Sequence, residues 1–207
     1  MITLLDGQPI SPAPDGLAAA LDAARVRAES AGRIIIDVRS DGEPIDGRLL
    51  SEPPADNAGI GELAMVSADK VAFLTTTIHD AGDALDAAVQ KQREAAEFVQ
   101  QGELEAAGEP LSEALATWQA VRDVVVHASA LAGVTPEEIE VPTEQGAVQA
   151  QDIIAELVGA LEEIKRALTQ QDWSALSDAI GYDLEDVAER WRAMLKQLAE
   201  VSAGAGA

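Results

Sequence analysis

The residues that could support metal binding or acid–base catalysis are the carboxylates and two histidines in the last two thirds of the chain. Helical proteins hold metal ions with Glu, or with a Glu-x-x-His pair, projecting from core positions of facing helices. Neither His79 nor His127 follows a glutamate by three residues, because Thr76 and Val124 occupy those positions. We therefore expect both histidines at the surface and predict no metal site.

The acidic residues of this region are numerous, but their spacing directs them to solvent. If its four apolar segments form helices, these acids fall at heptad positions b, c and f: Asp80, Asp83, Asp86, Glu94, Glu97, Asp123, Glu156, Glu162, Glu163, Glu185, Asp186 and Glu189. The pair Glu94-x-x-Glu97 resembles the first half of the magnesium site of all-helical nucleotide pyrophosphohydrolases. That family continues with ExxD on the next helix, where this chain has Glu113 followed by Ala116. We therefore do not assign this activity.

Sequence motifs for other chemistries are missing. The chain has no GxxxxGK[ST], GxGxxG, GxSxG or HExxH, and it has no cysteine for thiolate catalysis or thiolate metal ligation. We predict no catalytic residue, no cofactor and no metal ligand. The sequence favours a protein that is not an enzyme.

The charge balance narrows the kinds of partner. With 37 acidic and 14 basic residues the net charge is -23, which repels nucleic acid and anionic lipid and favours protein partners with basic or apolar patches. No apolar run approaches the ~18 residues of a membrane span. The N-terminal MITLLDGQPI lacks the basic and long apolar regions of a signal peptide. We expect a cytoplasmic protein.

Residues 1–66 have the pattern of a small mixed α/β domain. The pentapeptides DGQPI and DGEPI, at residues 6–10 and 41–45, each follow a short apolar run, and Asp-Gly is a hairpin turn signal. Between them, residues 17–32 have a helical period after Asp15, and RIIIDVRS is rich in β-branched residues. With ELAMVSA as the last strand, the predicted order is β-β-α-β-β-loop-β.

This order, and the run IIIDVRSDGEPIDGRLLSE in particular, resembles the ubiquitin-like β-grasp family. The resemblance covers the first third of the chain and implies a docking module. Because VSADK continues directly into a helical pattern, the chain lacks the free diglycine tail of that family, and we expect no conjugation to other proteins. A generic α/β sandwich with the same elements is the alternative.

Residues 68–200 predict an antiparallel four-helix bundle, because four segments repeat apolar residues at heptad positions a and d. The expected core positions are Val71, Leu74, Ile78, Ala81, Leu85, Ala88, Gln92, Ala95 and Val99; Leu111, Ala114, Trp118, Val121, Val125, Ala128 and Ala132; Ala147, Ala150, Ile154, Leu157, Leu161, Ile164 and Leu168; and Leu184, Val187, Trp191, Met194, Leu198 and Val201. The expected connections are residues 102–110, 133–143 and 170–183, and residues 201–207 are expected to be a disordered tail.

An internal similarity joins the two halves of the predicted bundle. LSEALATWQAV at residues 111–121 and LEDVAERWRAM at 184–194 place Leu, Trp and Ala at matching offsets. Duplication of a helical hairpin and convergence of two amphipathic helices both account for this similarity.

Five apolar residues are our candidates for partner binding: Val124, Val126, Ile139, Val141 and Trp173. Because Val124, Val125 and Val126 are consecutive, at least one must point away from the core seam. Ile139 and Val141 lie among acids in the long second connection, for which a plain crossing loop is the alternative. Trp173 follows Asp172, an expected helix N-cap, and begins a short amphipathic segment that would cap one end of the bundle.

We therefore predict an α+β, mostly α protein with a β-grasp-like domain followed by a four-helix bundle. The expected function is a non-catalytic, acidic protein–protein interaction module, such as an adaptor or an assembly or export chaperone, and self-association is a further hypothesis. The alternative is an enzyme or small-molecule-binding protein that uses a cleft between the two parts, with Arg33, Arg39 or Arg48 in its lining.

Overall fold

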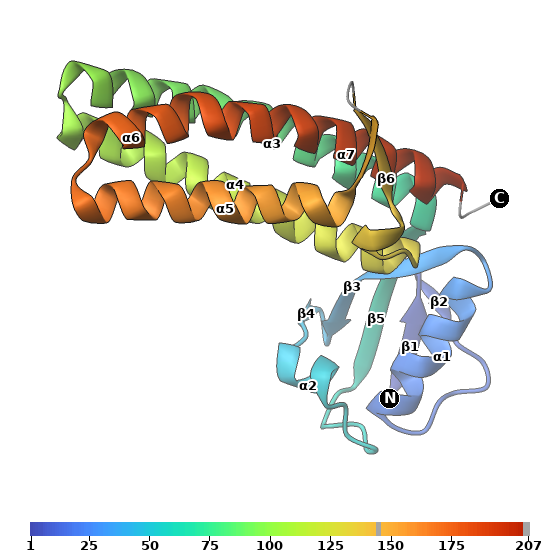
Figure 1. Ribbon diagram of the computed structural model, residues 1–207. Coiled ribbons are helices and arrows are strands. Elements are labelled where there is room, and N and C mark those ends of the chain that lie inside the picture. The colour runs from blue at the N-terminus through green and yellow to red at the C-terminus, as the bar shows by residue number, and fades with distance from the viewer. Residues whose placement is uncertain (144–145, 205–207) are drawn as a thin grey trace. The chain divides into compact units, whose positions relative to one another are not determined.

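The fold class is confirmed as α+β and mostly α by a computed structural model, which describes residues 1–143 and 146–204 (Figure 1). The chain forms two compact units, one from Met1 to Phe73 and one from Leu74 onward. The first unit contains the following elements: β1 (Ile2–Leu5), β2 (Gln8–Pro9), α1 (Leu17–Glu29), β3 (Arg33–Ser40), β4 (Glu43–Pro44), α2 (Gly47–Ser51) and β5 (Glu62–Asp69).

The five strands form one mixed sheet in the order β2-β1-β5-β3-β4. β1 runs parallel to β5, whereas β3 runs antiparallel to it, and the two-residue strands β2 and β4 close a hairpin at each edge. The predicted strands and α1 are all present, but the segment between β4 and β5, expected as a loop, begins with the short helix α2. Leu63 and Met65 of β5 pack with Leu17 and Leu21 of α1 in a separate small core.

The two DGxPI pentapeptides fasten the two ends of β5. Asp6 and Asp41 both have a left-handed backbone, with φ of 51° and 49°, as the tight turn requires. The Asp6 carboxylate accepts hydrogen bonds from the Ser67 amide at 2.7 Å and the Ser67 hydroxyl at 2.6 Å. The Asp41 carboxylate accepts from the amides of Glu62 at 2.8 Å and Gly61 at 3.1 Å. The repeated pentapeptide is therefore a repeated clamp on the central strand.

α1 begins where two loops of the small unit approach each other closely. Asp15 does not cap the helix; the N-cap is Gly16, which has a φ of 92°. Backbone carbonyls satisfy the first amides instead, because Leu17 N donates to Asp56 O at 2.8 Å. A Cβ on Gly16 would lie 1.8 Å from the Ala55 carbonyl oxygen, so this close approach of two loops requires glycine.

The second unit is the predicted antiparallel four-helix bundle. Its long helices are α3 (Lys70–Gln101), whose first turn belongs to the first unit, α4 (Leu104–Ala132), α5 (Ala150–Gln170) and α7 (Leu184–Gly204). Its shorter elements are a 3-10 turn η1 (Pro136–Glu138), β6 (Glu140–Thr143), β7 (Gly146–Gln149), α6 (Trp173–Asp178) and a π-helical turn η2 (Ala179–Asp183). No helix in the described part of the chain is both long and apolar enough to cross a membrane.

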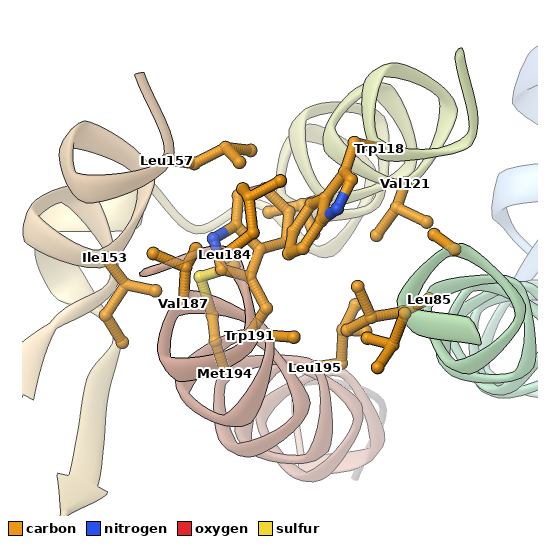
Figure 2. Packing of buried hydrophobic residues seen from close by; sticks show 14 of the residues in the cluster. Leu85, Trp118, Val121, Ile153, Leu157, Leu184, Val187, Trp191, Met194 and Leu195 are labelled. Carbon is orange, nitrogen blue, oxygen red and sulfur yellow. The ribbon is translucent and has the colours of Figure 1, made fainter. Parts of the chain in front are cut away.

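The core of the bundle is centred on two tryptophans. Trp118 of α4 and Trp191 of α7 pack edge to face, with ring centroids 5.6 Å apart and an interplanar angle of 89°, a favoured aromatic geometry. Figure 2 shows both rings between the four helices, with Leu85 of α3 and Leu157 of α5 at the periphery. The two tryptophans occupy the matching offsets of the internal sequence similarity, and duplication stays a hypothesis.

Three expectations about the connections were wrong. Residues 104–110, expected in the first connection, belong to α4. Pro110 lies inside this helix and does not mark its start. The second connection is a β6–β7 hairpin, so Ala147 lies in a strand and α5 begins only at Ala150. Residues 201–204, expected in a disordered tail, belong to α7, and Ser202 is buried. Residues 144–145 and 205–207 lie outside the described part of the chain.

The heptad assignment was right for α4, right for α3 and α7 except at the end positions Val71 and Val201, which are half-buried, and partly wrong for α5. Ala150, Leu157 and Ile164 are buried as expected, but Ile154 and Leu161 are half-buried and Leu168 is 41% exposed. Ile153 and Ala167 take their places in the core. The helix is therefore rotated about its axis relative to the predicted seam, and this rotation leaves large apolar side chains outside the core.

Candidate functional site

The acids and histidines that could support chemistry lie at the surface of the bundle, as expected from their spacing. The expected outward acids of the bundle are exposed or half-exposed, and both histidines are exposed. Several acids pair with nearby cations, including Asp86 with Arg192 at 2.7 Å and Glu94 with Lys91 at 3.4 Å. Among the described residues, no three metal-ligating side chains gather in a group that could hold an ion.

One ion pair joins two helices of the bundle at its surface. Arg93 of α3 donates two hydrogen bonds to the Glu185 carboxylate at the start of α7. These hydrogen bonds and the positive charge lower the pKa of Glu185, and the same pair raises the pKa of Arg93. The pair joins two helices at the surface, and its groups are already satisfied by each other.

The arginines of the cleft hypothesis have partners within the small unit. Arg33 donates to the Ser67 hydroxyl at 2.7 Å and to the Ser67 carbonyl at 2.6 Å. Arg39 donates to Asp37 at 2.8 Å. Arg33 therefore joins β3 to β5, whereas Arg39 pairs with a residue of its own strand, and the cleft enzyme stays an untested alternative.

The five candidate partner-binding residues occupy different environments. Ile139 and Val141 are buried in the bundle core, at 1% and 0% exposure, because η1 and the β6–β7 hairpin fold back onto it. Val124 is half-buried against the core, whereas Val126 is 49% exposed. Trp173 is 36% exposed at the start of α6. Only Val126 and Trp173 therefore present much apolar surface to solvent.

The end of the bundle near Trp173 is built as expected. Asp172 caps α6, because its carboxylate accepts a hydrogen bond from the Ala175 amide at 3.1 Å. Leu176 and Ile180 are buried beneath the segment. Trp173 itself remains at the rim, so the segment closes this end of the core with its other apolar residues.

An apolar groove with a volume of about 540 Å³ lies between α4 and α5. We call it the α4–α5 groove; its lining is Leu115, Trp118, Gln119, Arg122, Leu157, Leu161, Ile164, Lys165, Leu168 and Thr169. Its volume lies within the range of small-ligand and peptide-anchor pockets, about 300–1,000 Å³. Sequence analysis missed this groove because it assigned Leu161 and Leu168 to the core.

The groove exists because α7 approaches α4 and α5 more closely than these two approach each other. α5 has apolar residues on two adjacent rows of its surface. Ile153, Leu157 and Ile164 point into the core, and the neighbouring row of Leu161 and Leu168 remains on the side of α4. The facing surface of α4 is half polar, so it does not cover them.

The floor of the groove is continuous with the hydrophobic core. Trp118, Leu157 and Ile164 are at most 2% exposed. Figure 2 shows Trp118 of α4 and Leu157 of α5 among the packed residues of the core. The indole Nε1 of Trp118 donates to Gln92 Oε1 at 3.1 Å, which fixes the ring. The groove therefore has a rigid floor and walls of half-exposed leucine.

The apolar stripe continues beyond the groove. Val126 lies four residues after Arg122 on α4, and Val158 lies seven residues before Lys165 on α5, so each shares a helical face with the lining. Val126 is 49% and Val158 45% exposed. Val126 extends the stripe past the α4 lining, whereas Val158 lies beside the α5 lining between Leu157 and Leu161. The partner candidate Val126 thus joins the groove surface.

The rim of the groove is basic. Arg122 and Lys165 line it, and none of its described lining residues is acidic. Arg122 pairs with Asp123 at 3.6 Å, with both side chains about half exposed, and Lys165 forms no ion pair with any described residue. Two cations without a lining acid stand out in a chain with 37 acidic and 14 basic residues.

Comparison of the chain with protein-family models, curated proteins and solved structures finds no match.

Proposed function

We propose that the protein is a non-catalytic interaction module that binds a helical segment of another protein in the α4–α5 groove. The observation that supports this most directly is a strip of large, half-exposed apolar side chains between two antiparallel helices. Amphipathic helices bind such grooves through anchors at i, i+3, i+4 and i+7. An adaptor or an assembly chaperone would use this kind of site, and a cytoplasmic location stays a prediction.

The dimensions of the groove suit about three turns of a partner helix. Its α5 wall extends from Leu157 to Thr169, which is about 18 Å at 1.5 Å per residue. Full burial of a leucine side chain contributes about 1.5–3 kcal/mol. Leu168 is 41% exposed, so covering its remaining surface would contribute about 1 kcal/mol. Leu115 and Leu161 would add smaller amounts.

The decisive variant replaces Leu168 with aspartate. Leu168→Asp places a charge on the wall of the groove without disturbing the floor, so we expect loss of the partner and little loss of stability. Leu131→Asp is the matched control, because Leu131 of α4 is 38% exposed. It lies nine residues after Arg122, so it points to the opposite side of the helix, away from the groove.

The experiment compares partners retained by the full-length wild-type, Leu168→Asp and Leu131→Asp proteins from native extract, with thermal unfolding as a folding check. We expect one stoichiometric protein with the wild type and the control but not with Leu168→Asp. Retention of the same protein by Leu168→Asp would refute the groove as the binding site.

A further inference from the structure

We propose that the partner helix bound in the α4–α5 groove is acidic, with carboxylates on both sides of its apolar stripe. This inference rests on the proposed function and names the partner's chemistry. It predicts that a chain with a net charge of -23 prefers an anionic ligand at this one surface.

The two rim cations are placed on opposite walls. Arg122 belongs to α4 and Lys165 to α5, and both line the same groove. A helix lying between them would present its left and right flanks to one cation each. Acids on both flanks would then form ion pairs across the groove, as charges at the edges of a coiled-coil seam do.

Nearby acids leave this positive character in place. Asp123 pairs with Arg122 at 3.6 Å but does not line the groove. Exposed ion pairs of this kind contribute little free energy. Glu162 is exposed one turn before Lys165 and does not line the groove. Neither carboxylate lies between the cations and a bound helix.

The same charges argue against a second copy of the chain as the occupant. In a symmetric dimer that packs groove against groove, each rim would face an identical rim. Arg122 and Lys165 would then face cations of the other copy, and like charges across an interface oppose association. A separate acidic helix avoids this repulsion.

The probes are two designed 18-residue helical peptides with one leucine stripe, flanked by glutamates in one and by lysines in the other. Binding to the full-length protein is measured by fluorescence anisotropy of a label on the peptide. Exposed ion pairs contribute little each, so two pairs, together with repulsion of the lysine peptide, give about a three- to thirtyfold preference for the glutamate peptide. The net charge of the protein alone would give the opposite order.

Lys165→Gln, alone and combined with Arg122→Gln, should reduce or abolish this preference. Arg166→Gln is the matched control, since Arg166 is the next residue of α5, is exposed and pairs with Glu163. It should leave the preference intact. Leu168→Asp should weaken the binding of the glutamate peptide.

The outcomes separate the two claims. If the lysine peptide binds as tightly or more tightly, and Leu168→Asp weakens it, the groove binds a helix but its partner is not acidic. If neither peptide binds, or Leu168→Asp changes nothing, the proposed function fails as well. A dimer in light scattering that Leu168→Asp dissociates, or binding of palmitate in place of both peptides, would also overturn the inference.

Discussion

Removal of the Asp6 carboxylate should loosen β5 at one end. Asp6→Ala removes the acceptor of the Ser67 amide and hydroxyl and places alanine at a φ of 51°. Hydrogen bonds to a charged group contribute about 1.5–3 kcal/mol each. The Asp6 side chain is 38% exposed, so we assign about 1 kcal/mol to each. The left-handed backbone costs alanine about 1 kcal/mol more, which gives a total of about 3 kcal/mol.

Asparagine is the informative second substitution. Asp6→Asn keeps one acceptor oxygen and a residue type that tolerates a positive φ, so we expect a loss of about 1 kcal/mol. The small unit has no tryptophan or tyrosine, and hydrogen exchange of peptides covering β5 is therefore the suitable assay. A loss of 3 kcal/mol corresponds to an increase of about a hundredfold in exchange through opening of this unit.

The control is Asp37→Asn, which removes the same charge from a surface pair with Arg39 and should leave β5 exchange unchanged. Asp41→Ala, at the other end of β5, should resemble Asp6→Ala, because Asp41 accepts from two β5-end amides. Equal exchange of β5 in Asp6→Ala and Asp37→Asn would refute the clamp.

The same clamp predicts sensitivity to acid. The Ser67 hydroxyl and amide, followed by the charge of Arg33, lower the pKa of Asp6. Because the pKa is lower in the folded state, the stabilisation is complete above the unfolded value of about 3.9 and is lost as pH falls through the folded value. Exchange of β5, corrected for intrinsic rates, should rise below about pH 4. In Asp6→Asn, the part of this increase in exchange that comes from protonation of Asp6 should be absent.

Two further substitutions test the packing of each unit. Gly16→Ala should destabilise the small unit by about 2 kcal/mol or more, because its Cβ would lie 1.8 Å from the Ala55 oxygen; unchanged exchange of α1 would contradict this. Trp118→Phe should cost about 1–3 kcal/mol more than Trp191→Phe, because only Trp118 has a described indole hydrogen-bond partner, Gln92. Urea unfolding followed by circular dichroism measures the stability of the two tryptophan variants. Equal losses of unfolding free energy would contradict the prediction.

The sequence predicted the elements that depend on local chemistry. Asp-Gly pairs and β-branched runs located the hairpins and strands of the small unit, because tight turns need residues that accept a positive φ. The a/d repeat located the four long helices and placed both tryptophans in the core. The clamp by Asp6 and Asp41 could not be predicted in this way, because it joins residues up to 61 positions apart.

The position of the groove depends on which apolar row of α5 faces the core, and the sequence periodicity does not determine this. α5 carries apolar residues on two adjacent rows, through Ile153 and Ile154 and again through Ala167 and Leu168. Either row could face the core, and packing against α7 decides between them. Two basic residues on facing helices were the available signal for a site, but their proximity depends on the β6–β7 hairpin that the sequence pattern did not predict.

The central claim is that a partner occupies the α4–α5 groove. A photo-crosslinking residue placed at Leu168 in the full-length protein, in its native cell, tests this most directly, with the same residue at Leu131 as the control. We expect a single crosslinked protein from position 168, attached through an acidic amphipathic helix, and none from position 131. The same product from both positions, or from position 131 alone, would contradict it.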